Sequence, residues 1–366
     1  MKKVISFLLI FLALINILKF WSSNASLFFI KFDSIYFSNL YAHSQYVLGP
    51  NSENGIGDDG LYAFAGYYYF FQKGDVSVVN FEHPPFGKYL IGLSILLFKN
   101  ELVINVFYFT ILLLITYRLS RLYLDKFLSF IPMVLVGTDP LFLDHTIRSQ
   151  LDLPFTLFFV SGVYFFIISQ KKLGYIFLSQ LFWAAAFSTR FFPMLVIIEI
   201  YMLMTFVYAD RKNLKLFVIS MVLVPVLYLV CHLSFFYYHP SFIEFLRHKK
   251  WMVAWFTGTP IKTGNIIRNF FTGQLLDTTD KLVRNKEWSF IQPIILIFSM
   301  LPYKVNLLMG FAFIYILYTV FLTGGQAKFM MPIFPIISIL AVRNMTILYS
   351  IINKWMRLKF SFSKIK

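Results

Sequence analysis

The chain has 366 residues and a formal net charge of +16, and 58% of its residues are hydrophobic, 20% aromatic and 14% charged. Soluble domains carry about 25% charged residues, and a chain this apolar could not cover its surface with polar groups, so a water-soluble domain is excluded. The composition predicts an all-α polytopic membrane protein. We expect no nucleic-acid partner, because the cations recur between apolar runs, as membrane topology requires.

Ten segments are apolar enough to cross a membrane as helices, which need about 20 mostly apolar residues each. In chain order they are 4–21, 101–117, 127–143, 153–169, 173–189, 191–208, 216–236, 289–303, 305–322 and 329–349. The segment 289–303 is short and contains Gln292 and Pro293, so it either crosses the membrane or re-enters it. We therefore expect a single transmembrane domain over residues 1–366, with about 10 helices.

Lysine and arginine predict the orientation, because short cytoplasmic loops accumulate these cations. With the N-terminus inside, every connection on that side is basic, and the basic tail 350–366 lies in the cytoplasm. The inner cations are Lys2, Lys3, Arg118, Arg121, Lys126, Lys171, Lys172, Arg211, Lys212, Lys215, Lys304 and those from Arg343 to Lys366. The short outer connections carry one cation each, namely Arg148, Arg190 and Lys328. We expect the functional face on the outer side.

Two long segments, 22–100 and 237–288, are predicted to lie outside the membrane. Connections this long usually bind or catalyse something. Within the first, residues 86–98 are apolar but too short to cross, and Pro84 and Pro85 precede them. This pattern predicts a helix lying at the outer membrane interface.

Two adjacent carboxylates, Asp58 and Asp59, occur in the first outer segment. An aspartate in a water-poor pocket is a reasonable general base for removing a proton from an alcohol. The alternative is a structural role, because glycines flank the pair in Gly57-Asp58-Asp59-Gly60 and such a sequence also suits an Asx turn or a helix N-cap. The two residues alone leave both interpretations open.

An ordered set of motifs resembles those of a known family. The pair Asp58-Asp59 is followed, 25 residues after Asp58, by His83-Pro84-Pro85-Phe86-Gly87-Lys88. These sequences resemble the DE and HPPLGK motifs of the protein O-mannosyltransferases, membrane glycosyltransferases of the GT-C superfamily. Further matches follow in the family's order: Asp139-Pro140 with 148–152 resembles DP…SRxxLLD, 188–191 resembles TKW, and 328–335 is similar to RYLLPxFP.

The chain also departs from the family's pattern. Asp59 stands where the family usually has Glu, and Phe81 stands where it has an Asp two places before the His, with Glu82 directly before His83 instead. A divalent metal therefore has no clear ligand set in the sequence. A sugar-binding MIR-type insertion is missing from the sequence as given, so the acceptor stays open between a protein, a glycan and a lipid.

The resemblance implies a fold and an activity. The fold is a GT-C-like bundle with two long non-cytoplasmic loops and an interfacial helix. Such enzymes transfer a sugar, here expected to be mannose, with inversion from a polyprenyl-phosphate donor to an acceptor hydroxyl on the non-cytoplasmic side. Asp58 is then expected to be the general base, with Asp59 as the second acid of the pair.

The donor's phosphate needs positive charge, because its own charge grows as the glycosidic bond breaks. The three isolated outer cations, Arg148, Arg190 and Lys328, are expected to hold it, since they lie at the depth of a lipid phosphate. The alternative for each is ordinary snorkelling or contact with membrane phospholipid.

Several further residues are candidates for the site. His83 and Lys88 belong to the motif, and Glu82 adjoins it; His83 either contacts the donor or merely holds its loop. Asp152 comes four residues after Arg148, so we expect the two to pair on one helix face. Glu199 lies in the sixth span, where an acid is either functional or shared with a neighbouring helix.

A transporter or lipid flippase is the main alternative from another class, since it too is polytopic and basic on the inside. It should show symmetric halves with interrupted helices and ionisable pairs near the midplane, and only Glu199 fits that pattern. A non-catalytic scaffold is the third interpretation. We expect the protein in the plasma membrane of a prokaryote, with its active site facing outside.

Overall fold

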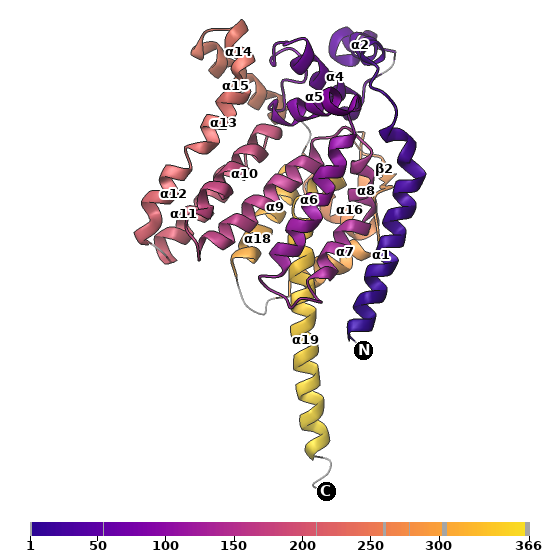
Figure 1. Cartoon of the computed structure of the whole chain (residues 1–366), viewed down its shortest axis with the longest axis vertical. Helices are drawn as coiled ribbons and strands as arrows, with labels where there is room; N and C mark the ends of the chain where they lie inside the picture. The colour runs from indigo at the N-terminus through magenta and orange to yellow at the C-terminus, as the bar shows by residue number, and fades with distance from the viewer. Residues whose placement is uncertain are drawn as a thin grey trace.

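The computed structural model describes residues 2–53, 55–209, 211–258, 261–277, 279–301 and 306–362. Apart from one short β-hairpin the regular structure there is helical, and α2, α4, α5, α14 and α15 gather at the end of the bundle opposite the C-terminus (Figure 1). The bundle comprises α1 (Lys2–Asn24), α6 (Val103–Ser120), α7 (Phe130–Thr138), α8 (Pro140–Thr146), α9 (Asp152–Ser169), α10 (Tyr175–Thr189), α11 (Leu195–Ala209), α12 (Leu214–Ser220), α13 (Leu223–Cys231), α17 (Ile291–Ser299), α18 (Leu307–Leu322) and α19 (Phe334–Phe362).

The two predicted outer segments are folded and are not extended loops. They contain α2 (Ser34–Ala42), α3 (Gln45–Leu48), α4 (Asp58–Phe71), α5 (Phe86–Phe98), α15 (Phe242–Thr257), α16 (Asn265–Thr272), β1 (Gln274–Leu276) and β2 (Leu282–Arg284), and α14 (Leu233–Tyr238) leads from the predicted span 216–236 into the second of them. The two strands pair antiparallel, with Leu275 opposite Val283. Four 3-10 helices complete the described elements: η1 (Ala25–Phe28), η2 (Gly49–Asn51), η3 (Arg211–Asn213) and η4 (Ala327–Met330).

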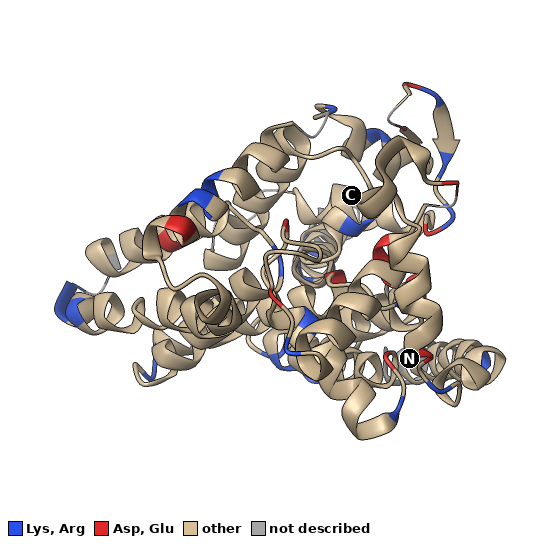
Figure 2. Ribbon diagram, turned by 90° about the horizontal axis from the view of Figure 1, so that it is seen from above, with Lys and Arg blue, Asp and Glu red and all other residues tan. Residues whose placement is uncertain are grey.

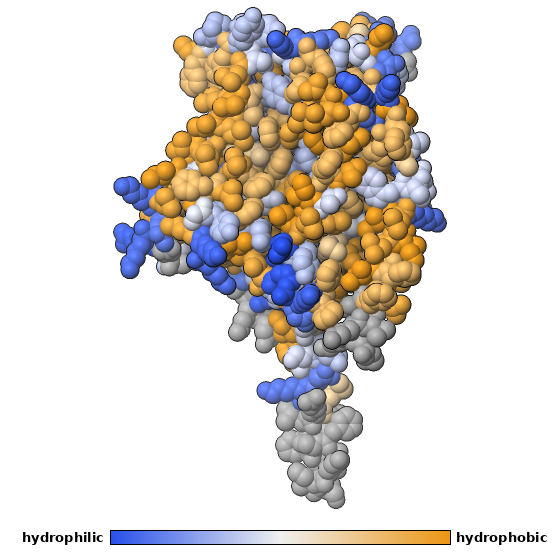
Figure 3. Space-filling model, in the orientation of Figure 1, coloured by the Kyte–Doolittle hydropathy of each residue, from blue (hydrophilic) through white to orange (hydrophobic). Residues whose placement is uncertain are grey.

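The prediction of an all-α polytopic membrane protein is confirmed. Five of the predicted spans are long and apolar enough to cross a membrane: Ile10–Phe28, Val103–Ser120, Asp152–Ser169, Arg211–Cys231 and Phe334–Met356. Three others form α10, α11 and α18, which have 15 or 16 residues each. Apolar side chains cover the middle of the bundle surface, and hydrophilic residues gather below it and at the top of the view (Figure 3). From above, most of the ribbon carries no charge (Figure 2).

The predicted span 127–143 is wrong as a single helix. It is divided into α7 and α8 at Asp139 and Pro140. Pro140 has no N–H to continue the hydrogen-bond ladder, and the Asp139 carboxylate caps the new helix by accepting a hydrogen bond from the Leu141 amide at 3.0 Å. The break thus separates α8 from α7 as a helix of its own.

The segment 289–303 does not form a helix long enough to cross. Its helix, α17, has nine residues, or about 14 Å at 1.5 Å per residue, whereas the hydrocarbon core is about 30 Å thick. Gln292 is fully buried and donates a hydrogen bond to Asp139 at 3.0 Å, so α17 packs beside the broken span. Lys304, one of the predicted inner cations, lies outside the described residues.

Two further predicted segments, 86–98 and the described part of the tail 350–366, are helical. The apolar segment 86–98 forms helix α5 as predicted, beginning directly after Pro85. The predicted basic tail begins as a continuation of α19 up to Phe362, and residues 363–366 lie outside the described residues. In Figure 1 this helix projects beyond the rest of the bundle.

The centre of the bundle depends on close contact between α9 and α10. Trp183 of α10 is fully buried, and its indole ring lies against Gly162 of α9, where an added Cβ would come within 2.8 Å of the ring. Ser179 donates a hydrogen bond to the Gly162 carbonyl at 2.9 Å. A side chain at position 162 would therefore force these two helices apart.

We predict that Gly162→Ala destabilises the protein, because overpacking against a rigid, buried ring costs about 1–3 kcal/mol and exceeds the gain in helix propensity. Thermal unfolding of the protein in detergent should show a lower midpoint. Gly174→Ala is the matched control, because nothing lies within 4 Å of an added Cβ there. Equal midpoints for the two variants would show that the contact is not tightly packed.

Candidate active site

An ion pair between two residues that are far apart in the sequence forms the centre of the site. Lys328 Nζ lies 2.6 Å from Asp58 Oδ2, although 270 residues separate them. Asp58 is the first residue of α4, and Lys328 lies in η4, just before α19. The Lys328 side chain is 18% exposed and that of Asp58 is 41% exposed. The lysine is therefore mostly buried, and the carboxylate that it contacts is accessible.

The cation controls the ionisation of Asp58. Burial acts to raise the pKa of this carboxyl, but Lys328 and then Arg190 lower it by more, so the pKa of Asp58 lies below its usual range. For Lys328, burial lowers the pKa of the ammonium, and Asp58 opposes this effect. Asp58 is therefore an ionised carboxylate that is held by a cation.

Neither acid of the pair caps α4 with its side chain. The N-cap of α4 is Gly57, and no side chain accepts a capping hydrogen bond there. Asp59 accepts a hydrogen bond from the amide of its neighbour Gly60, at 3.0 Å, and is exposed. Both acids lie in the first turn, where the helix dipole favours negative charge.

Arg190 forms a second ion pair beside the first. Its guanidinium contacts the carboxylate of Asp152, and both side chains are nearly buried. The guanidinium also lies over the ring of Phe329, 4.9 Å from its centroid. Because Phe329 directly follows Lys328, Arg190 and Asp152 support the segment that carries the Asp58 partner. We expected Asp152 to pair with Arg148; that prediction is wrong.

Arg148 instead pairs one turn earlier in the chain. Its Nε lies 2.8 Å from Asp144 Oδ2, and its Nη2 donates to Asp144 Oδ1 at 3.1 Å. The physical reason is the end of α8 at Thr146: the helix face that a pair between positions 148 and 152 requires does not exist, because α9 begins only at Asp152. The Arg148 side chain stays 46% exposed.

The HPP-type motif forms a buried hydrogen-bonded loop. The Lys88 ammonium is fully buried and donates to the carbonyls of Asn80 and His83, at 2.5 and 2.7 Å. Glu82, also buried, accepts from the Asn80 side-chain amide at 2.7 Å. Burial lowers the pKa of Lys88 to about 7, against the opposing effect of Glu82. Through these contacts Lys88 and Glu82 stabilise the conformation of the loop.

His83 joins this loop to the one that follows Arg190. Its Nδ1 accepts a hydrogen bond from the Phe191 amide at 3.4 Å, and its ring lies between those of Tyr62 and Phe256. Burial, followed by the neighbouring cations Arg190, Lys88 and Lys328, lowers its pKa well below the usual value, so the imidazole is neutral. The proton of the neutral ring is then on Nε2.

A cavity of about 580 Å³ adjoins Lys328. Two of the three predicted phosphate-binding cations, Arg148 and Lys328, line it, together with Arg284 and Lys286 from the second outer segment. Asp144 and Glu287 also line it. Burial and then the neighbouring Asp144 raise the pKa of Glu287 to about 7, while Arg148 and Lys328 oppose this. The third cation, Arg190, is not among the lining residues but acts on Asp58 directly.

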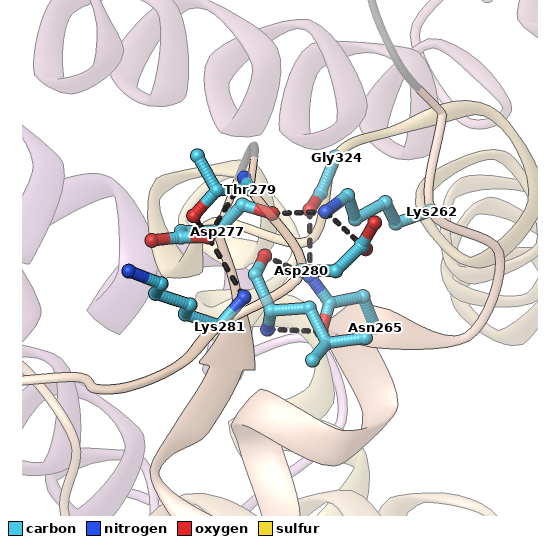
Figure 4. A network of polar contacts seen from close by, with 8 residues as sticks. Lys262, Asn265, Asp277, Thr279, Asp280, Lys281 and Gly324 are labelled. Carbon is cyan, nitrogen blue, oxygen red and sulfur yellow. Dashed lines mark hydrogen bonds and ion pairs between the residues drawn. The ribbon is translucent and has the colours of Figure 1, made fainter.

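Two asparagines fasten the chain just before Lys328. Asn265 and Asn269 of α16 donate to the carbonyls of Gly324 and Gly325, at 2.8 and 2.9 Å. Asn265 also holds the β-hairpin, because its side chain is hydrogen-bonded to the backbone of Leu276. Figure 4 shows the neighbouring turn, where Thr279 donates to Asp277 and Lys262 donates to Asp280. Sequence reasoning missed both asparagines, because an amide in a polar segment carries no signal of the distant carbonyl that it binds.

The intramembrane acid Glu199 has a partner on a neighbouring helix. Gln180 of α10 donates to its carboxylate at 2.9 Å. This contact agrees with the interpretation that Glu199 joins two helices. Because glutamine does not ionise, the contact is not the ionisable pair that the transporter hypothesis expects.

Comparison with known proteins links these features to a family. Residues 82–236 match the family model of the dolichyl-phosphate-mannose-protein mannosyltransferases. This region contains the HPP-type motif, Arg148, Asp152 and Arg190, but neither Asp58 nor Lys328. No curated protein matches the sequence.

Two crystal structures of ArnT from Cupriavidus metallidurans share the fold. The structure bound to undecaprenyl phosphate matches with a TM-score of 0.61 at 16% identity, over 80% of this chain and 56% of that chain. The apo structure matches with a TM-score of 0.60 at 13% identity, over 80% and 55%. This chain thus spans little more than half the length of these relatives. Over residues 82–236 the chain is therefore similar to the dolichyl-phosphate-mannose-protein mannosyltransferases, and its fold is similar to that of ArnT.

Proposed function

We propose that the protein is an inverting glycosyltransferase, which moves mannose from a polyprenyl-phosphate donor to an acceptor hydroxyl on the non-cytoplasmic side of the membrane. The observation that carries the proposal is the Asp58–Lys328 pair, with Arg190 close enough to lower the pKa of Asp58 and Arg148 in the adjoining cavity. A base and phosphate-binding cations thus lie side by side. The ArnT fold, which binds undecaprenyl phosphate, supports the donor class, and the matched family supports mannose.

The charges of the reactants match this arrangement. The donor is a phosphodiester with one negative charge, and the departing polyprenyl phosphate carries an additional one. Cations at the phosphate therefore bind the leaving group more strongly than the substrate, which lowers the barrier. In the proposed step the acceptor oxygen forms a bond to the anomeric carbon and gives its proton to Asp58. The bond from that carbon to the phosphate oxygen breaks, and its electron pair leaves with the phosphate.

Donor binding also activates the base. While Lys328 pairs with Asp58, the low pKa of the carboxyl makes it a weak base. When Lys328 turns to the donor's phosphate, Asp58 loses the cation and its burial raises its basicity. Arg190, oriented by Asp152, and Arg148, oriented by Asp144, complete the phosphate contacts. The exposed Asp59 is assigned to the acceptor, as a hydrogen-bond partner of its hydroxyl group.

The first prediction concerns the base. Asp58→Asn should lower sugar transfer by at least 100-fold, because general-base catalysis contributes about 10²–10⁴ and the amide cannot take the proton. The assay uses purified protein in lipid with radiolabelled polyprenyl-phosphate mannose and a broad acceptor mixture. Glu53→Gln, an exposed acid of the same outer segment, is the control. Wild type that fails with mannose, glucose and other polyprenyl-phosphate sugars would contradict the proposal, and transport assays would follow.

The second prediction concerns pH. Because Lys328 lowers the pKa of Asp58, Lys328→Met should leave burial to raise it, and the base works only when it is deprotonated. The acid limb of the pH profile of kcat/KM, which reports the free enzyme, should therefore move to higher pH, in addition to a loss of rate. Lys286→Met, which removes another cation of the cavity, should leave the limb in place. A profile that does not move in Lys328→Met would show that the pair does not control the base.

The third prediction separates Lys88 from the donor-binding cations. Lys88→Met should lower the midpoint of thermal unfolding, since the buried carbonyl of Asn80 loses its donor at about 1–3 kcal/mol and the half-buried carbonyl of His83 loses its donor too. Lys99→Met, an exposed lysine at the other end of α5, should change stability little. A variant of position 88 with normal stability but no transfer would instead assign this lysine to the donor.

A further inference from the structure

Three potential metal ligands converge in the cavity beside Lys328. Asp144 and His145 lie near the end of α8, and Glu287 lies in the connection before α17. Each offers one ligand atom, and these atoms all lie within 4.8 Å of one another. The three residues come from two parts of the chain that are 142 residues apart in sequence, and all line the same cavity.

One ring nitrogen of His145 has no hydrogen-bond partner among the described residues. Its Nδ1 lies 2.9 Å from the carbonyl oxygen of Leu141, which can only accept, so Nδ1 carries the proton. The lone pair is therefore on Nε2. The side chain is only 1% exposed, and Nε2 has no hydrogen-bond partner in the described part of the chain. A buried acceptor without a partner is costly unless it binds something.

The remaining contacts of the cluster fix its orientation. Arg148 holds Asp144 through both carboxylate oxygens, and each oxygen keeps a further lone pair. The backbone amide of Glu287 donates to Asn285 at 2.9 Å, and its carbonyl accepts from Gln292 at 3.1 Å, so the loop position of Glu287 is held from both sides. Hydrogen-bonded outer partners of this kind orient the ligands of metal sites.

We propose that Asp144, His145 and Glu287 bind a divalent transition-metal ion, Zn²⁺ or Mn²⁺. One imidazole nitrogen with two carboxylate oxygens is a ligand set suited to these ions, and the cavity leaves room for water or a substrate oxygen at the open positions. The two carboxylates offset the charge of the ion amid Arg148, Arg284, Lys286 and Lys328. If the proposed function holds, a phosphate that reaches Lys328 shares this cavity with the ion.

The test measures ion binding without donor or acceptor, so its result does not depend on the transfer reaction. The full chain in lipid nanodiscs is stripped with chelator and titrated with Mn²⁺, and the free ion is followed by electron paramagnetic resonance. Zn²⁺ is then added as a competitor. We expect one ion per chain for wild type and at least tenfold weaker binding for Glu287→Gln and for His145→Gln, since each loses a direct ligand.

Glu244→Gln is the matched control, because Glu244 is an exposed glutamate of the same outer segment and lies outside the cluster. Zn²⁺ should raise the thermal midpoint of wild type and of this control but not of the two ligand variants. Size-exclusion profiles establish that each variant is folded. The proposal is overturned if stripped wild type binds no ion at millimolar concentration, or if a folded ligand variant binds as tightly as wild type.

Discussion

The ion pair between Asp58 and Lys328 is the contact on which the arrangement of the site depends, because it joins the outer segment near the start of the chain to the entry of α19. Everything that positions either partner serves this contact. On one side, α4 is held against α5, where Gly66 and Gly92 lie so close together that an added Cβ on Gly92 would come within 2.5 Å of the Gly66 carbonyl oxygen. On the other, asparagines of α16 bind the carbonyls that precede Lys328. A carboxylate that a cation neutralises in this way can be buried at lower cost than one left alone.

Each of the three cations of the site contacts one carboxylate. Arg190 is held by Asp152 and Arg148 by Asp144, so each guanidinium is oriented by one carboxylate while the ammonium of Lys328 is held by the base itself. Guanidinium groups stay charged under all ordinary conditions and bind phosphate in a fixed geometry, whereas a lysine on a flexible stem can move between two anions. The site thus combines two fixed cations with one that can change its partner.

Sequence patterns predicted the membrane class, five of the spans, helix 86–98 and the residues that gather around Asp58 and Lys328. They failed where the answer depends on tertiary placement. The partners of Arg148 and Arg190 could not be predicted, because spacing along the chain favoured residue 152 for Arg148 and said nothing of a contact between α9 and α10. The division of 127–143 at Asp139-Pro140 was visible in principle, since proline with a preceding aspartate is typical of a helix start. Lys88 and Glu82 were predicted from their motif, and the sequence could not show that both are buried and hydrogen-bonded within one loop.

The 270-residue separation of the two partners has a consequence for biosynthesis. While the ribosome is still making the chain, Asp58 has already emerged, but its cation and the asparagine-bound turn before it do not yet exist. A nascent chain therefore carries an acid without the lysine that completes the pocket. The ion pair forms only once residue 328 has been made and lies beside α4, so a chain that ends earlier leaves Asp58 without this partner.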